Sequence, residues 1–349
     1  MTSKKDPLRG FRSARQERLS RRQKEQRKQR VAMGLIASFI ILVLGIVLYG
    51  YVTTFVLPPR QVIVRVDDTK YTMGDMIQVL RMMQRGSEFF GQKMDLSTVP
   101  FQVPLSLAQR EIIARAVPRF NINVTEDQID DEIRLRLLPN VAEGQEVAEE
   151  QLEREFKERY RQYLNAIQFS EEEYRVMVLA DIERDLLREI VGQDVPRIAE
   201  QIHVNAIAMP DLGELEILKS KFADGTNWKQ LVREFNQDPQ LANSDGDLGW
   251  TPRGVVPELD EFLFGLEIGK LSEPMSEQNG QVVYMISEKA DAREIDYDDR
   301  ESLKTHALQE WLDEQWDKYD IETNFTSDDY AWVTKQLGIS TILQAQGQS

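Results

Sequence analysis

An uncharged apolar run near the start of the chain constrains its fold more than any other feature. Residues Val31 to Leu57 form 27 consecutive positions without a charged side chain. About 20 apolar residues suffice for a helix to cross a bilayer, where a helix satisfies its own backbone groups. A cleaved signal peptide has a shorter apolar core and a small-residue cleavage site, whereas bulky residues followed by Pro58 and Pro59 end this run. We therefore predict an uncleaved transmembrane anchor in the lipid bilayer at residues 31–57.

Charge is distributed unevenly on the two sides of this run. Residues 1–30 hold 12 Lys and Arg against 3 Asp and Glu, so their +9 leaves −25 for the remainder of a chain whose formal charge is −16. A nucleic-acid arm could look similar, but this tail directly precedes the apolar run and has no interleaved aromatic residues. The positive-inside rule explains it better. We predict a basic cytoplasmic tail at 1–30, a single pass through the cell membrane, an extracytoplasmic remainder and no nucleic-acid partner.

Residue usage argues against several classes of enzyme. The chain has no cysteine and only two histidines, His203 and His306. A thiolate nucleophile or a cysteine-ligated metal is therefore impossible, and little is left for a histidine metal site or a Ser-His-Asp relay. We expect no metal and no cofactor.

Residues 61–196 predict a mostly helical domain that begins with one strand. QVIVRVDD alternates apolar and polar residues, and MGDMIQVLRMM follows at helical spacing. Thr125 with Gln128, and Ser170 with Glu173, have the spacing of capping boxes ahead of amphipathic runs. The methionines of residues 73–83 could form an adaptable surface for unfolded clients, although core packing explains them better.

Residues 197–290 change to a mixed α/β pattern. The ordered series FADGTNWKQLVREFNQDPQ, DGDLGW, PRGVVPELDEFLFGLEIGKLSEPM and NGQVVYMIS resembles the parvulin family of peptidyl-prolyl cis/trans isomerases. The flanking layout is similar to membrane-anchored foldases of the PrsA and PpiD kind, with a helical region similar to that of the chaperone SurA. The resemblance implies a small domain with an antiparallel sheet and surrounding helices, which rotates X-Pro amides in translocated polypeptides.

The resemblance also implies which residues would line the site. Asp238 stands at the family's Cys-or-Asp position near the rotating amide, although an Asp before Pro239 is equally typical of a turn. Two histidines that commonly lie in the floor of a parvulin site are replaced here. The proline-ring pocket would use Leu248, Val255 and Leu259, Asn279 would face the site from a loop, and Ala206 and Val282 would take the two histidine positions.

The remaining residues, 291–349, predict C-terminal helices that pack on the helical region. Residues 297–319 and 327–337 have helical spacing, and their tryptophans are expected to pack in a core more readily than to bind peptide. The fold class is therefore α+β: a transmembrane helix at 31–57, a SurA-like chaperone domain at 61–196, a parvulin-like domain at 197–290 and C-terminal helices.

Three functions are compatible with these residues. The first is a foldase that isomerises X-Pro bonds in unfolded or newly translocated polypeptides, in contact with the secretion machinery. The second is a non-catalytic holdase chaperone with a degenerate parvulin domain, which the loss of both histidines favours. The third is an assembly factor or structural subunit of a membrane complex, which would have one stoichiometric partner.

Overall fold

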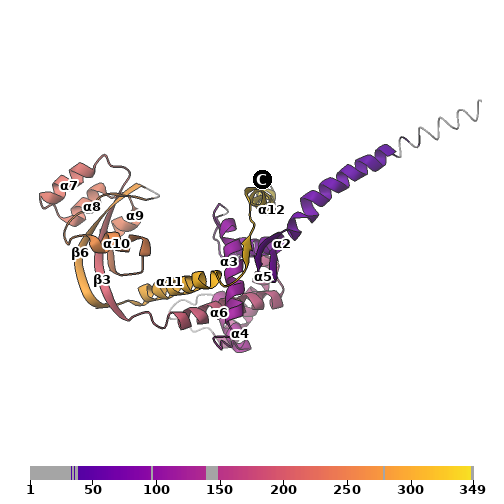
Figure 1. The fold of residues 1–349 in the computed structure, drawn as a ribbon, viewed down its shortest axis with the longest axis horizontal. Coiled ribbons are helices and arrows are strands. Elements are labelled where there is room, and N and C mark those ends of the chain that lie inside the picture. Colours follow the sequence, from indigo (N-terminus) through magenta and orange to yellow (C-terminus); the bar gives the residue numbers. More distant parts are fainter. Residues whose placement is uncertain are drawn as a thin grey trace, which may run out of the picture.

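The computed structural model describes residues 33, 35, 38–95, 97–138, 148–277 and 280–346, with side-chain burial given as far as residue 338. Figure 1 shows a long apolar helix at one end, a helical body in the middle and a smaller α/β body at the other end. The architecture is α+β, as the sequence predicts.

The apolar helix is regular over residues 38–51 and then changes its winding. It continues as the π-helix η1 (Val52–Val56) and ends in the 3-10 turn η2 (Pro58–Arg60). The segment Ser38–Arg60 is long and apolar enough to cross a membrane, and none of its apolar window is buried inside the structure. The basic tail predicted at 1–30 lies outside the described residues.

A three-stranded antiparallel sheet pairs a hairpin that follows the apolar helix with a short strand from the C-terminal part of the chain. Strands β1 (Val62–Val66) and β2 (Thr69–Thr72) form a hairpin, and β7 (Ile321–Thr323) adds to the free edge of β1. Helix α2 (Met73–Phe89) follows directly, with a capping box at Thr72. The predicted strand β1 and helix α2 are confirmed, whereas strands β2 and β7 were not predicted from the sequence.

Helices α2 to α6 form most of the described part of the middle body, and local cap signals position several of them. Capping boxes begin α4 (Glu126–Leu137) at Thr125 and α6 (Glu171–Val191) at Ser170, as the spacing predicts. Met73 and Met76 are fully buried in the core, so for these two methionines packing is the correct interpretation. The helices after α2 are α3 (Val99–Ala116), α4 (Glu126–Leu137), α5 (Glu149–Ile167) and α6 (Glu171–Val191).

The smaller body is built on a four-stranded antiparallel sheet of order β4-β3-β6-β5. Its strands are β3 (Ile198–Met209), β4 (Asp247–Pro252), β5 (Met275–Glu277) and β6 (Gly280–Glu294). Its helices are α7 (Leu215–Ala223), α8 (Trp228–Phe235), α9 (Pro239–Asn243) and α10 (Pro257–Gly265). The predicted break between two helices at Gly225 separates α7 from α8.

Two C-terminal helices return the chain to the middle body (Figure 1). Helix α11 (Tyr297–Trp316) packs with α3 and α6 in one apolar cluster that includes Leu308 and Leu312. Helix α12 (Ser327–Gln346) packs in the cluster of β1 and α2 through Val333 and Leu337. All three tryptophans of these helices lie against the core clusters, so none forms an isolated surface patch.

Candidate functional site

Alternation along β3 divides its side chains between two cores. Ile202, Val204 and Ala206 face the cluster that includes residues of α10, whereas Ile207 faces the cluster of α7 and α8. Side chains on a strand alternate between faces, so residues two apart share one side. The α10 side of the sheet is the side that carries a large cavity.

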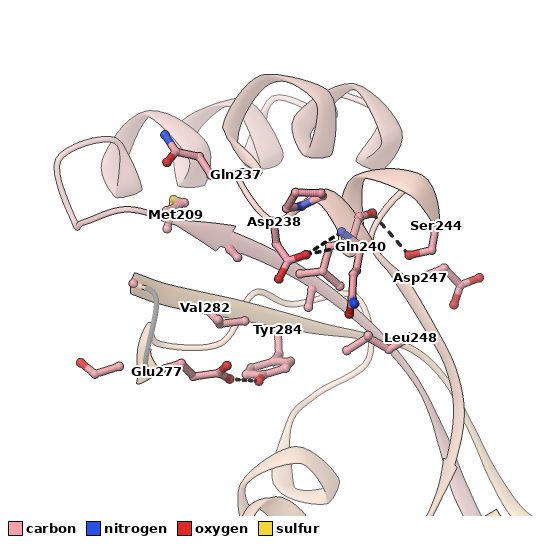
Figure 2. A pocket seen from close by; sticks show the side chains of 16 residues that line it. Met209, Gln237, Asp238, Gln240, Ser244, Asp247, Leu248, Glu277, Val282 and Tyr284 are labelled. Carbon is pink, nitrogen blue, oxygen red and sulfur yellow. Dashed lines mark hydrogen bonds between the residues drawn. The ribbon is translucent and has the colours of Figure 1, made fainter. Parts of the chain in front are cut away.

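This cavity measures about 1000 Å³ and is lined by residues of β3, α9, β4, β5 and β6. Figure 2 shows 16 lining side chains, with β3 and β6 crossing beneath α9. Clefts of this size commonly hold ligands in proteins. The cavity is therefore the candidate functional site of the small body.

The floor of the cavity is apolar at Ala206 and Val282, the two positions that the sequence resemblance assigns to histidine in parvulins. Ala206 and Val282 are 1% and 7% exposed, and both line the cavity. In the sheet, Ala206 pairs with Tyr284 and Ala208 pairs with Val282. Because Val282 and Tyr284 are two apart on β6, both point to the same face. The floor is built from small and aliphatic side chains with one phenol beside them.

That phenol is held by a carboxylate from the next strand. The Tyr284 hydroxyl donates a hydrogen bond of 2.5 Å to Oε1 of Glu277 (Figure 2). The Tyr284 ring lies edge-on to Phe262. Burial raises the pKa of Tyr284, and the Glu277 carboxylate raises it further. The phenol therefore stays protonated at neutral pH and can act only as a neutral hydrogen-bonding group. Sequence reasoning missed this pair, although the period-two alternation from Val282 could have found Tyr284.

Asp238 begins α9 instead of standing free in the cavity. Its Oδ1 accepts hydrogen bonds from the backbone N–H of Gln240 at 2.6 Å and of Leu241 at 3.2 Å (Figure 2). This is the usual role of an Asp at a helix N-cap before a proline at the first helical position. Asp238 also lines the cavity, so its carboxylate reaches the site while it caps the helix.

A glycine of the GDLGW motif sets the wall between α9 and β4. Gly246 has φ +77°, and its carbonyl accepts from the backbone N–H of Ala206 at 2.8 Å. A Cβ at this position would lie 2.7 Å from the Ala206 carbonyl oxygen and 2.7 Å from Val232 Cγ2. Only glycine allows this approach, which places β4 and its Leu248 beside the cavity floor.

The structure brings together some of the site residues expected from the sequence and separates others. Ala206, Asp238, Leu248 and Val282 all line the cavity, and Leu248 is 50% exposed there. Val255 and Leu259 are outside the lining; Leu259 packs against the apolar cluster beneath it, and Val255 lies in the turn before α10. Asn279 lies outside the described residues.

Neither histidine of the chain reaches the cavity floor. His203 projects from the other face of β3, where its Nδ1 lies 2.9 Å from Ser287 Oγ and its ring meets Trp250 edge-on. His306 lies on α11, where its Nδ1 is 2.7 Å from the Gly254 carbonyl oxygen. His203 is three residues before Ala206, so alternation along β3 places the two side chains on opposite faces of the strand.

Comparison with known proteins matches the body that holds the cavity to a known family. Residues 213–288 match the family described as "Rotamase: PPIC-type PPIASE domain". "Foldase protein PrsA" of Geobacillus kaustophilus is 26% identical over 196 residues, which cover 48% of this chain and 69% of that protein. "Parvulin-like PPIase" of Rickettsia prowazekii is 30% identical over 94 residues, covering 26% of this chain and 33% of that protein.

Other relatives are matched over shorter parts of their length. A PrsA foldase of Geobacillus sp. is 23% identical over 145 residues, so the chain spans about half of that protein, 52%. Among solved structures, PrsA of Bacillus anthracis aligns with 65% of this chain and 96% of its own, at 18% identity and a TM-score of 0.36. Residues 213–288 are thus a parvulin domain of the PPIC type, in a chain that is similar in sequence to the PrsA foldases.

Proposed function

We propose that this chain is an extracytoplasmic, membrane-anchored foldase that accelerates cis/trans isomerisation of X-Pro bonds in unfolded polypeptides. The observation that carries the proposal is the apolar-floored cavity of about 1000 Å³ on the parvulin sheet. The reaction needs no bond-breaking nucleophile, because only rotation about an amide with a barrier of roughly 18–20 kcal/mol must be eased. A site without cysteine or histidine is compatible with that task.

The physical mechanism rests on what the cavity does to the amide. A planar amide gains from charge-separated resonance, and water stabilises that separation. When the X-Pro bond lies against Ala206, Val282 and Leu248, it leaves water and its double-bond character weakens. The Tyr284 hydroxyl, which donates its proton to Glu277, can still accept a hydrogen bond from a backbone N–H of the bound segment and so help to hold it on the floor. Ala206, Asp238, Leu248, Val255, Leu259, Asn279 and Val282 remain the residues proposed to contact or support the bound proline segment.

A protease-coupled isomerisation assay on X-Pro peptides tests this proposal, with the full chain in lipid nanodiscs. Leu248→Ala removes apolar contact from the cavity and should lower kcat/KM by about three- to tenfold. Leu212→Ala is the matched control, because Leu212 is 52% exposed, similar to the 50% of Leu248, and does not line the cavity. No acceleration by the unaltered chain would refute isomerase activity.

A holdase without isomerase activity is the second candidate, favoured by the apolar replacements Ala206 and Val282. The middle body offers a place for clients, since two neighbouring hollows of about 380 and 430 Å³ share Glu172 and the half-exposed Val176. This candidate predicts that the chain suppresses client aggregation while X-Pro isomerisation stays at background. An assembly factor of a membrane complex, the third candidate, would instead co-purify with one stoichiometric partner, and the secretion machinery is one such partner.

Membrane anchoring is part of the proposal and rests on the exposed apolar helix and the basic tail. The absence of cysteine allows single cysteines to report topology without background labelling. With a membrane-impermeant maleimide, Glu216→Cys should react in intact cells from which any outer layer has been removed. Ser3→Cys should react only after permeabilisation. The reverse pattern would place the parvulin domain in the cytoplasm and contradict the proposed location.

A further inference from the structure

The charged side chains that line the parvulin cavity all carry the same sign. Asp238, Asp247 and Glu277 contribute carboxylates to its wall, and no Lys, Arg or His is among the lining residues that the structure describes. The cavity itself is identified by its volume, its apolar floor and the parvulin domain that holds it, so the carboxylates bear on which segments it accepts.

In each of the three carboxylates, one oxygen accepts a hydrogen bond that orients the group. Asp238 Oδ1 accepts from the α9 backbone, Asp247 Oδ1 accepts from the Gly249 N–H at 2.8 Å, and Glu277 Oε1 accepts from Tyr284. Within the described part of the chain, their second oxygens have no hydrogen-bond partner. The carboxylates are therefore oriented and still able to accept.

No Lys or Arg neutralises these carboxylates among the described residues. Among the described residues, the one basic side chain within 4 Å of any of them is His203, whose Nε2 is 3.5 Å from Asp247 Oδ1. Two acidic side chains elsewhere in the same domain are paired with a basic residue: Asp245 with Lys229 at 3.0 Å, and Glu200 with Arg253 at 2.8 Å. The cavity thus keeps negative charge that no described Lys or Arg pairs with.

The carboxylates lie on both sides of the apolar floor. In Figure 2, Glu277 lies at one side of Val282 and Tyr284, Asp247 lies at the other, and Asp238 hangs above the floor from the start of α9. A polypeptide whose proline ring sits on the floor would extend toward these groups on either side. A neighbouring residue with a long cationic side chain can reach a carboxylate while its stem covers apolar wall.

We propose that this cavity selects proline segments in which a residue adjacent to the proline is Lys or Arg, and disfavours Asp or Glu there. The inference rests on the proposed function, because it names the substrate class of the same site. Attraction between partly exposed charges is modest and is screened by salt, so the expected selectivity is about threefold or more at low ionic strength.

Peptide binding, measured apart from turnover, tests this selectivity. The full chain in nanodiscs of zwitterionic lipid is titrated against fluorescent peptides that differ only beside proline, with Lys, Arg, Gln, Glu or Ala before or after it. Fluorescence anisotropy should give tighter binding for Lys and Arg than for Gln, and weakest binding for Glu. The ratio of the Kd values for the Glu and Lys peptides should fall toward one at 0.5 M salt, because salt screens the attraction between exposed charges.

Two substitutions locate the source of the preference. The double variant Asp247→Asn, Glu277→Gln should bring the Lys-to-Glu ratio of Kd values toward one, while Glu216→Gln on α7 should leave it unchanged. Equal binding of Lys and Glu peptides at low salt would overturn the inference. So would a preference that survives both the double variant and the further substitution Asp238→Asn, because it would then come from charge outside the cavity. A Lys preference without any isomerisation would support the inference and contradict catalysis.

Discussion

At the scale of single residues, one carboxylate joins the N-terminal hairpin to α3. Glu111 accepts hydrogen bonds from Thr69 at 2.8 Å, from Tyr71 at 3.0 Å and from Arg115 at 2.7 Å. The same Arg115 reaches Asp67 in the turn of the hairpin at 2.7 Å. Burial acts to raise the pKa of Glu111, but the hydrogen bonds from Arg115, Thr69 and Tyr71 outweigh it and hold that pKa below its ordinary value.

A lowered carboxyl pKa makes the stability of this region depend on pH. The stabilisation by Glu111 is complete above its ordinary pKa of 4.5 and is lost as pH falls through the lower folded value. Glu111→Gln should therefore cost about 1–3 kcal/mol at pH 7, and the penalty should fade in strong acid. Thermal unfolding midpoints of the unaltered chain and of Glu111→Gln, compared at pH 7 and in strong acid, measure this penalty. Glu314→Gln, at an exposed position, is the control. A penalty independent of pH would contradict this account.

The sequence predicts a site residue's position where that position follows from the alternation of side chains along one strand. It does not predict contacts that depend on how two strands pair. The alternation of β3 was enough to separate His203 from Ala206. The Tyr284 and Glu277 contact requires the register of β5 against β6, which joins strands across a loop and cannot be read from either segment alone. Leu259 was expected in the proline pocket; in the structure it lies on α10, outside the cavity lining, and packs against the cluster that includes the floor residues Ala206 and Val282.

At the scale of elements, the end of the apolar helix is completed by a residue from the far end of the chain. The Thr54 carbonyl would accept from residue 58 in an α-helix or residue 59 in a π-helix, and both are prolines without an N–H. The Trp332 indole of α12 donates to it instead, at 3.1 Å. Helix α12 therefore fixes the direction in which the apolar helix leaves the middle body.

Trp332→Phe should loosen this attachment while keeping the aromatic packing. Loss of the hydrogen bond from Trp332 to the Thr54 carbonyl costs about 1 kcal/mol. Amide hydrogens of α12 that exchange through its opening should then exchange about fivefold faster. Hydrogen exchange of residues 327–338 in nanodiscs measures the change. Trp311→Phe on α11 is the control, because Trp311 lies in a different core cluster. Unchanged exchange in Trp332→Phe would show that packing alone holds α12.

Elements were predictable from sequence to the extent that their signals are local. The capping boxes at Thr125 and Ser170 begin their helices as predicted, since side chain and backbone partners lie within four residues. Strand β7 carried no comparable signal, because its three residues become a strand only by pairing with β1. Arg65 and Glu322, which contact each other across that pair, are 257 positions apart.

At the scale of the whole molecule, the parvulin body meets the middle body through α11. Lys304 on α11 is buried between Glu189 of α6 at 2.6 Å and Glu301 at 2.7 Å, which fastens α11 to the middle body. Two residues further along α11, His306 Nδ1 lies 2.7 Å from the Gly254 carbonyl oxygen, in the turn that carries Val255. The position of the parvulin body relative to α11 therefore rests in part on this contact.

His306→Ala should let the parvulin body move relative to the middle body without unfolding either. Losing a hydrogen bond worth about 1 kcal/mol would raise the ratio of displaced to docked molecules about fivefold. The cysteine-free chain allows spin labels at Lys157→Cys and Glu216→Cys, and pulsed electron paramagnetic resonance then reports the distance between the bodies. The distribution should broaden for His306→Ala and remain narrow for Glu310→Ala, an exposed position on the same helix. Identical distance distributions in the two variants would contradict this role of His306. They would mean that strands β3 and β6, which connect the parvulin body to the rest of the chain, hold it in place without the His306 contact.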